Sequence, residues 1–143
     1  MAWVATSDLV EHISQWLGTR PGSEYDLAAL AERGLPLSTI STLLAKGLTK
    51  SEVFRIVIPE RTLKHRKARR ERLNREESDR AIRTARLLAH AGAVFGSDKR
   101  ALEWMRQPKR RFEKRSALEL MTTETGGRLV EEMLIQTDEG MFA

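Results

Sequence analysis

Helix start and stop signals recur along this chain, and they constrain its fold more than any other feature. In a capping box, a Ser, Thr or Asn before a helix and a Glu three residues later each accept a hydrogen bond from the other's backbone N–H. Three pairs fit this pattern: Thr49 with Glu52, Asn74 with Glu77, and Ser116 with Glu119. Gly18, Gly34, Gly47 and Pro108 lie where apolar helical spacing stops. We therefore expect an all-α fold.

The apolar spacing places nine helices between these signals. They are a helix between Ser7 and Gly18, 26–33, 39–46 capped by Ser38, one following Thr49, one from Pro59, 75–95, 98–107, one following Ser116, and about 126–136. The last is expected to bury Leu129, Val130, Met133 and Leu134. The first helices are too short to be stable alone in water, so they must pack together. The apolar run 53–58 alone is also compatible with a short strand, but the capping box at Thr49 favours a helix there.

A very short connection separates the helix after Thr49 from the next one. Pro59 suits the first position of a helix because its missing N–H has no partner there, and Glu60 suits the positive end of the helix dipole. A helix, a tight turn and a basic second helix form the layout of a helix-turn-helix unit, whose second helix enters the major groove of DNA.

The charge of the chain is concentrated at this second helix. The whole sequence carries +5, yet residues 60–75 hold eight Lys or Arg against two Glu, a local charge of +6. A second basic cluster runs over 106–115, and the charge becomes acidic from Ser116 onward. Such runs are often solvated surface, but a basic stripe in an otherwise slightly acidic chain suggests a polyanion site.

Helical geometry indicates which side chains could meet DNA. If Leu63 faces the core, Arg61, His65 and Ala68 lie on the opposite side, with Thr62 and Lys64 flanking them. Arg61, Lys64 and His65 are placed to meet base edges, and the basic residues further along are better placed for phosphates: Arg66, Lys67, Arg69, Arg70 and Arg72. The predicted DNA-binding set is Arg61, Thr62, Lys64, His65, Arg69 and Arg70.

The chain ends in an apolar tip, Gly140, Met141, Phe142 and Ala143, after an acidic helix. A free tail normally ends in polar residues, since exposed Met and Phe gain nothing from water. The tip therefore either folds back on its own domain or inserts into another protein.

Several function classes find no support in the sequence. The histidines, His12, His65 and His90, fall on three different predicted helices, and no zinc-protease pair, phosphate loop or serine elbow is present. The chain has no cysteine, so disulfides and thiolate metal sites are excluded. We expect no catalytic residue, no metal and no cofactor. No apolar run approaches the ~20 residues of a membrane helix, and no signal peptide is evident, so we expect a cytoplasmic protein without a membrane partner.

Six segments, in order, resemble the Xre/MbcA/ParS antitoxins over about 34–143. The segments 58–66 and 73–80 resemble that family's helix-turn-helix half. The segments 94–96 with 101–105, 118–124 and 127–132, and the ending 138–143, resemble its toxin-binding half. Three positions depart from the usual pattern: Asn74-Arg75 replaces Ser-Pro, Ala117 replaces proline, and Phe112-Glu113-Lys114 replaces a glycine-containing stretch.

The resemblance implies an antitoxin with an N-terminal extension (1–33), an Xre-like helix-turn-helix domain (34–73) and a small helical toxin-binding domain (74–143). Its partners would be a RES-domain toxin that consumes NAD or transfers ADP-ribose, and operator DNA. Gly140, Met141, Phe142 and Ala143 would bind the toxin near its NAD pocket, and the complex would repress its own operon. A homodimer is expected, with the small residues Ala89, Gly92 and Ala93 allowing close helix approach. The alternative is a stand-alone repressor that uses the same helix-turn-helix without a toxin.

Overall fold

The computed structural model of the chain describes residues 6–140, and the fold is helical as expected. The elements are α1 (Thr6–Leu17), α2 (Glu24–Arg33), α3 (Ser38–Ala45), α4 (Lys50–Ile56), α5 (Glu60–Arg69), α6 (Arg75–Phe95), α7 (Asp98–Arg106), β1 (Pro108–Lys109), η1 (Arg110–Phe112), β2 (Arg115–Ser116), α8 (Ala117–Leu120) and α9 (Glu124–Asp138). The side chain of Ser7, the predicted first cap, lies outside the described part.

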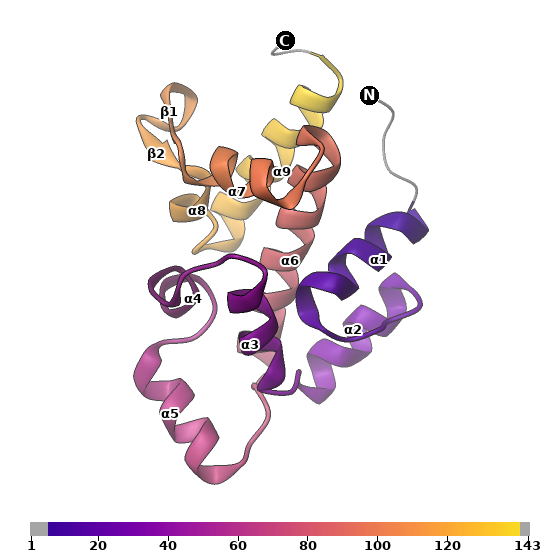
Figure 1. The fold of residues 1–143 in the computed structure, drawn as a ribbon, viewed down its shortest axis with the longest axis vertical. Helices are drawn as coiled ribbons and strands as arrows, with labels where there is room; N and C mark the ends of the chain where they lie inside the picture. The colour runs from indigo at the N-terminus through magenta and orange to yellow at the C-terminus, as the bar shows by residue number, and fades with distance from the viewer. Residues whose placement is uncertain (1–5, 141–143) are drawn as a thin grey trace.

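The long helix α6 is the centre of the molecule (Figure 1). Helices α1 and α2 pack on one side of it, and α7 and α9 pack along its C-terminal half. Alanines on its buried faces allow this close approach from several directions, and Ala81, Ala85 and Ala91 are fully buried. Its cap forms as predicted, because Asn74 Oδ1 accepts from Glu77 N and Glu77 Oε1 accepts from Asn74 N, both at 2.8 Å.

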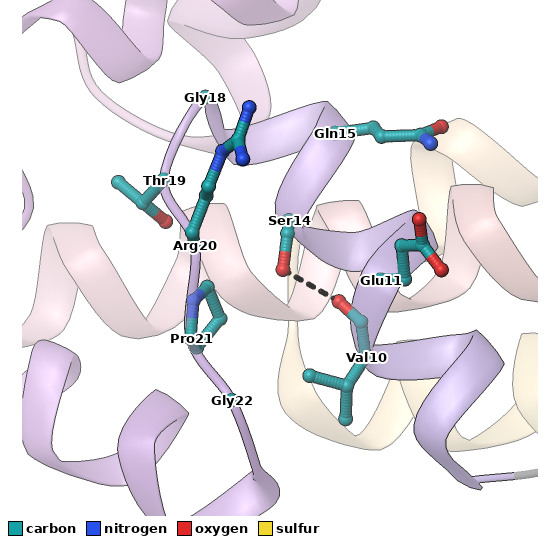
Figure 2. A pocket seen from close by; sticks show the side chains of 9 residues that line it. All are labelled: Val10, Glu11, Ser14, Gln15, Gly18, Thr19, Arg20, Pro21 and Gly22. Carbon is teal, nitrogen blue, oxygen red and sulfur yellow. Dashed lines mark hydrogen bonds between the residues drawn. The ribbon is translucent and has the colours of Figure 1, made fainter.

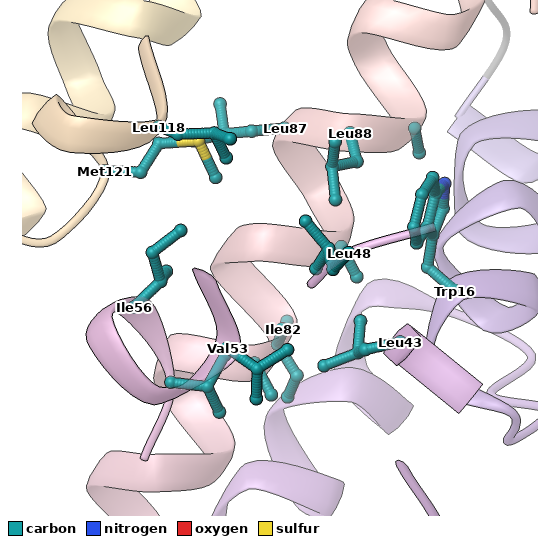
Figure 3. Packing of buried hydrophobic residues seen from close by; sticks show 14 of the residues in the cluster. Trp16, Leu43, Leu48, Val53, Ile56, Ile82, Leu87, Leu88, Leu118 and Met121 are labelled. Atoms are coloured by element: carbon teal, nitrogen blue, oxygen red, sulfur yellow. The ribbon is translucent and has the colours of Figure 1, made fainter. Parts of the chain in front are cut away.

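One apolar cluster runs through the whole fold from α1 to α9 (Figure 3). Trp16 of α1 meets Leu43 and Leu48 beside α6, and Leu118 and Met121 close the opposite end against Leu87. The two halves of the chain therefore share a continuous core and are built on the same helix.

The N-terminal helices belong to this core. Trp16 is 1% exposed, and the ammonium group of Lys46 lies 4.9 Å from the centre of its ring. Lys46 also pairs with Asp98 at 2.8 Å, which joins α3 to the start of α7. Arg86 of α6 forms two hydrogen bonds to Glu24 of α2, at 2.7 and 2.8 Å.

Several predicted helix starts are shifted. Ser7, predicted as a cap, lies within α1, and α2 begins at Glu24 instead of 26, because the hydroxyl of Ser23 accepts from Asp26 N at 3.2 Å. Ser38 is the first residue of α3 and not its cap, because the backbone carbonyls of Pro36 and Leu37 accept the first N–H groups. Pro59 is the residue before α5 and not its first position, since its extended backbone places only its carbonyl in the helix. Helix α9 begins at Glu124 instead of 126, because the hydroxyl of Thr123 caps it.

One further expectation was wrong. Leu129, predicted to face the core, is 47% exposed, whereas Val130 and Leu134 of the same helix are fully buried. The second basic cluster, 106–115, includes most of a small antiparallel pair in which Pro108 faces Ser116 and Lys109 faces Arg115.

The close approach of α8 and α9 leads to a prediction about two neighbouring glycines. A Cβ on Gly126 would lie 1.9 Å from the backbone oxygen of Leu120, whereas one on Gly127 would meet side chains alone, Arg83 Cδ at 3.1 Å and Leu87 Cδ1 at 3.7 Å. We expect Gly126→Ala to lower the free energy of unfolding by about 3 kcal/mol or more, since backbone must move, and Gly127→Ala to change it by less than about 1 kcal/mol. Urea denaturation measures both, and equal midpoints for the two variants would contradict this packing.

Candidate nucleic-acid interface and partner-binding surface

The helix-turn-helix unit consists of α4, the turn 57–59 and α5. The capping box that starts α4 is complete, with Glu52 N donating to Thr49 Oγ1 at 3.1 Å and Thr49 N donating to Glu52 Oε1 at 2.8 Å. The turn is anchored in the apolar core, because Val57 and Ile58 are at most 1% exposed. The tight turn therefore holds α5 at a defined angle to α4.

Helix α5 presents its basic side to solvent. Leu63 is its buried residue, at 5% exposure, as the spacing predicted. Arg61, Lys64 and His65 are exposed, and Thr62 is half-buried. Lys64 lies 3.4 Å from Glu60 in an exposed pair, which is too weak to hold it away from a phosphate or a base.

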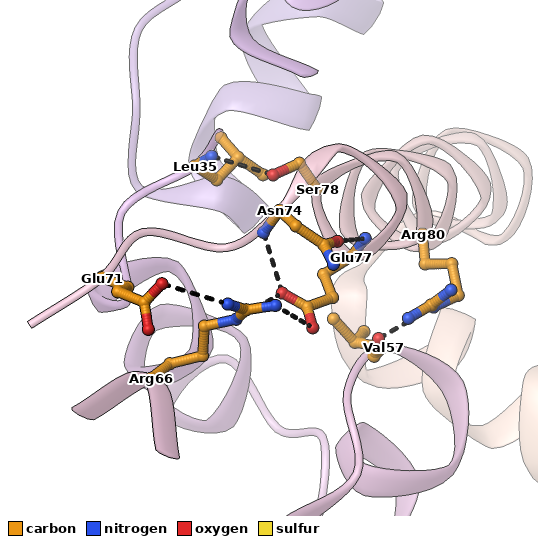
Figure 4. Close-up of polar contacts among 8 residues, drawn as sticks. All are labelled: Leu35, Val57, Arg66, Glu71, Asn74, Glu77, Ser78 and Arg80. Atoms are coloured by element: carbon orange, nitrogen blue, oxygen red, sulfur yellow. Dashed lines mark hydrogen bonds and ion pairs between the residues drawn. The ribbon is translucent and has the colours of Figure 1, made fainter. Parts of the chain in front are cut away.

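Arg66, predicted to contact a DNA phosphate, instead forms an ion pair within the protein. The Arg66 guanidinium binds both carboxylate oxygens of Glu77, at 3.1 and 3.2 Å, and lies 3.4 Å from Glu71 (Figure 4). The hydrogen bonds to Glu77 raise the pKa of Arg66 further above its already high value. Since Glu77 is 3% exposed and also caps α6, this pair fixes α5 to α6. Arg66 is therefore a structural residue.

Three more polar contacts fix the turn of this unit and the segments that flank it. The Arg80 guanidinium donates to the carbonyl of Val57 at 2.9 Å, where α4 ends (Figure 4). The Leu35 N–H donates to the hydroxyl of Ser78 at 2.9 Å, also drawn in Figure 4, and the Leu73 N–H donates to the Leu35 carbonyl at the same distance. The turn and the segment before α3 are thus attached to the start of α6.

The C-terminal end of α5 is formed by a second arginine in an unusual conformation. Arg70 has φ 54° and ψ 41°, the left-handed region, and its N–H donates to the carbonyl of Lys67 at 3.2 Å. Arg69 and Arg70 are both exposed at this end. They follow Arg61, Lys64 and His65 along the chain and extend the exposed basic side to the end of α5.

The hairpin β1–β2 is held by a buried lysine. Lys109 is 9% exposed, its ammonium group lies 4.1 Å from the centre of the Trp104 ring, and it donates to the backbone carbonyls of Trp104 and Gln107. These carbonyls end α7, where a cation is favourable. Burial lowers the pKa of Lys109 to about 8. Lys109 therefore fixes the hairpin to the end of α7.

The tip of this hairpin contains two left-handed residues that are not glycine. Glu113 has φ 53° and Lys114 has φ 69°. These positions fall in the stretch where the sequence departs from a glycine-containing pattern. The turn still closes, with Lys114 N donating to the Lys109 carbonyl at 2.8 Å, although left-handed backbone costs an L-residue roughly 1–2 kcal/mol.

Arg106 adds a link between α7 and the helix-turn-helix. Arg106, at the end of α7, forms two hydrogen bonds to Glu52, at 2.8 and 2.9 Å, and donates to the Gly47 carbonyl at 2.7 Å. Burial alone would raise the pKa of Glu52, but its hydrogen bonds from Arg106 and Thr49 outweigh burial and lower it. Glu52 thus caps α4 and joins the two halves.

In the sequence, helix α9 is followed within two residues by the apolar tip, residues 140–143. Gly140 has φ 80°, is exposed, and has open space where a side chain would begin. The other predicted toxin-binding residues, Met141, Phe142 and Ala143, lie outside the described residues. The structure thus describes only the start of the predicted toxin contact.

Neither a membrane span nor a metal site emerges from residues 6–140. No helix in this part is long and apolar enough to cross a bilayer. No group of three or more His, Asp or Glu in the same range could hold a metal ion.

A tight helix–turn–helix with an exposed basic second helix defines a DNA-binding protein of the helix-turn-helix class, here fused to a second helical domain. Comparison with known families agrees. Residues 26–86 match the antitoxin Xre-like helix-turn-helix domain, and residues 90–140 match the antitoxin Xre/MbcA/ParS C-terminal toxin-binding domain.

Two curated relatives cover most of the chain. Antitoxin Xre of Pseudomonas putida is 36% identical over 118 residues, which are 82% of this chain and 74% of the relative. Antitoxin Xre of Yersinia enterocolitica is 33% identical over 113 residues, which are 77% of this chain and 76% of the relative. The chain belongs to the Xre/MbcA/ParS antitoxin family. It is an antitoxin whose two matched domains indicate DNA and a toxin as partners, and membership in this family indicates a regulatory protein.

Proposed function

We propose that this antitoxin neutralises a RES-domain toxin that consumes NAD or transfers ADP-ribose, and represses its own operon through α4 and α5. The observation that carries the proposal is the pairing of two surfaces on one core: the exposed basic face of α5 and the open end of α9 at Gly140. The choice of a RES-domain toxin is supported by the resemblance of the C-terminal segments to antitoxins of such toxins.

The tip Met141-Phe142-Ala143 would block the toxin. Gly140 supplies a left-handed turn at the end of α9, which redirects the chain away from the helix axis. Phe142 could then fill an apolar slot shaped for a flat ring, and the terminal carboxylate could pair with a basic residue that otherwise holds phosphate. Burial of one Phe and one Met would contribute about 1.5–3 kcal/mol each.

The test of the proposed partner is the sequence and activity of the gene next to the one that encodes this antitoxin. A RES-type reading frame there, whose product stops growth unless this antitoxin is co-expressed and which co-purifies with it, supports the proposal. An isolated gene whose product binds its own promoter would instead identify the stand-alone repressor.

We infer that DNA contacts come from residues 34–73 and toxin contacts from residues 74–143. The Arg106–Glu52 hydrogen bonds and the shared core give the two parts a fixed relation. The N-terminal part, residues 1–33, would support the helix-turn-helix, since α1 and α2 pack on α6.

The proposed division of roles along α5 gives a test at the DNA. Replacing Arg61 and His65 by Ala should reduce the preference for promoter DNA by about 1–3 kcal/mol for each lost base contact. Arg69→Ala with Arg70→Asn, which tolerates the left-handed backbone, should weaken binding to promoter and scrambled duplexes alike. Fluorescence anisotropy with both duplexes measures this. Promoter binding that survives all four changes at moderate salt would refute the assignment of α5 as the reading helix.

A homodimer is part of the proposal, because two-fold operators are bound by two-fold proteins. The small residues on α6 do not supply the interface by themselves: Ala89 lies in the chain's own core, and a Cβ on Gly92 would meet Asp98 Oδ1 at 3.3 Å. Light scattering at micromolar concentration is expected to give twice the 16.3 kDa mass of the chain. A monomer, both alone and with promoter DNA, would contradict it.

A further inference from the structure

Two shallow hollows flank the loop between α1 and α2, and Thr19, Arg20 and Pro21 line both. The first, of about 510 Å³, lies against α1 and is shown in Figure 2. Among the described residues that line it, Arg20 and Glu11 alone are charged, and their charges offset each other. This hollow shows no preference for a charged ligand.

The second hollow, of about 420 Å³, collects arginines from three separate segments. Arg20 comes from the α1–α2 loop, Arg33 from the last turn of α2, and Arg72 from the segment between α5 and α6. All three are exposed. Asp26 is the one acidic residue in its lining, and its carboxylate already accepts the Gly22 N–H at 2.8 Å. The hollow therefore carries a surplus of positive charge.

This hollow adjoins the end of the DNA-reading helix. Arg72 follows Arg69 and Arg70 by a few residues, and its guanidinium donates to the Gly34 carbonyl at 3.1 Å, directly after α2. The Leu73–Leu35 backbone hydrogen bond holds the same two segments together. In Figure 1 the segment leaving α5 passes the end of α2 on its way to α6. A duplex followed along its backbone past the end of α5 would therefore reach Arg33 and Arg20.

We propose that this hollow binds the sugar–phosphate backbone of the duplex beside the site that α5 occupies, with Arg20 and Arg33 each contacting a phosphate. The inference rests on the proposed binding of DNA by α5 and adds contacts from outside the helix-turn-helix. Guanidinium groups match phosphate oxygens in geometry as well as charge. Pro21, Leu30 and Pro36 in the lining offer apolar surface of the kind that deoxyribose contacts.

A DNA backbone fits this hollow better than a protein partner does. Among the described residues that line it, none is an exposed aromatic or large aliphatic side chain that could serve as a hot spot, because Leu30 is half-buried and the others are Thr, Pro, Ala and charged residues. Positive charge on a shallow, open surface is the usual feature of backbone contacts.

The test is the salt dependence of DNA binding by the double variant Arg20→Ala/Arg33→Ala. Arg72 is left unchanged because it also bonds Gly34. The control Lys99→Ala/Arg100→Ala removes the same charge from exposed positions on α7, which packs along the C-terminal half of α6. The probe is a labelled 30-bp duplex from the promoter beside the gene, measured by anisotropy at several salt concentrations. The slope of log K against log salt should fall by about 0.9 for each lost phosphate contact, so by nearly 2 in the double variant, and stay unchanged in the control.

Four results would overturn the inference. If Arg20→Ala/Arg33→Ala has the slope of the control while Arg61→Ala loses promoter preference, α5 binds DNA and the hollow does not. If wild type fails to bind the duplex even at low salt, the proposed DNA function itself fails. If inorganic phosphate raises the melting temperature of wild type but not of the double variant, and the slopes agree, the hollow takes a free anion. If the double variant loses toxin co-purification with its DNA slope intact, the hollow is a protein contact.

Discussion

Removal of residues 140–143 is expected to abolish growth rescue in cells that express the proposed toxin. Met141 and Phe142 are the large apolar residues among these four, and burying them in a toxin pocket would contribute roughly 3–6 kcal/mol together. A loss of that size weakens binding by a factor of about 10² to 10⁴. Viable counts after toxin induction, with full-length and truncated antitoxin expressed equally, measure the effect.

The truncation should leave the rest of the protein intact. Gly140 has open space around it, and the cluster of buried residues includes Leu134 of α9 but none of the residues from 135 to 140. The thermal midpoint and promoter affinity should therefore match wild type, and Phe142→Ala alone should give a partial loss of rescue. Full rescue by the truncated protein would show that the tip only packs on its own domain.

Local signals predicted most of the fold. The boxes at Thr49 and Asn74 form with both hydrogen bonds, and the range predicted for the long helix, 75–95, is that of α6. The two partners of a capping box are only three residues apart, so the pattern can be recognised in the sequence without knowing how distant segments pack. At Ser116 the hydroxyl likewise accepts from Glu119 N, at 3.2 Å. The helices start where their own residues can satisfy the first N–H groups.

Features that depend on distant residues could not be predicted in this way. Arg66 belongs to a basic run on an exposed helix, and only the approach of α6 turns it toward Glu77. Leu129 has helical spacing from apolar residues, yet α9 contacts its neighbours through Gly126, Gly127 and Val130 and leaves Leu129 outside. The hairpin depends on Lys109 reaching back to the end of α7.

The exposure of the candidate DNA-contacting residues was predicted better than the contacts around them. Helical geometry from the single buried residue Leu63 correctly predicted that Arg61, Lys64 and His65 are exposed, because one buried position fixes the orientation of a short helix. The convergence of Arg20, Arg33 and Arg72 could not be seen in the sequence. They lie on separate segments that only the packing of α1 and α2 on α6 brings together.

That packing leads to the largest expected effect on stability. Trp16→Ala should lower the free energy of unfolding by about 3–5 kcal/mol, because the indole is 1% exposed and fills the space between α1, α3 and α6. Tyr25→Ala is the matched control: it removes another aromatic ring from the same N-terminal part, but that ring is 81% exposed and should change stability by less than about 0.5 kcal/mol. Urea denaturation followed by circular dichroism measures both. Similar midpoints for the two variants would mean that the packing of α1 contributes little to the stability of the fold. A large difference would show that residues before the matched helix-turn-helix domain are needed to hold α6, and with it both binding surfaces, in place.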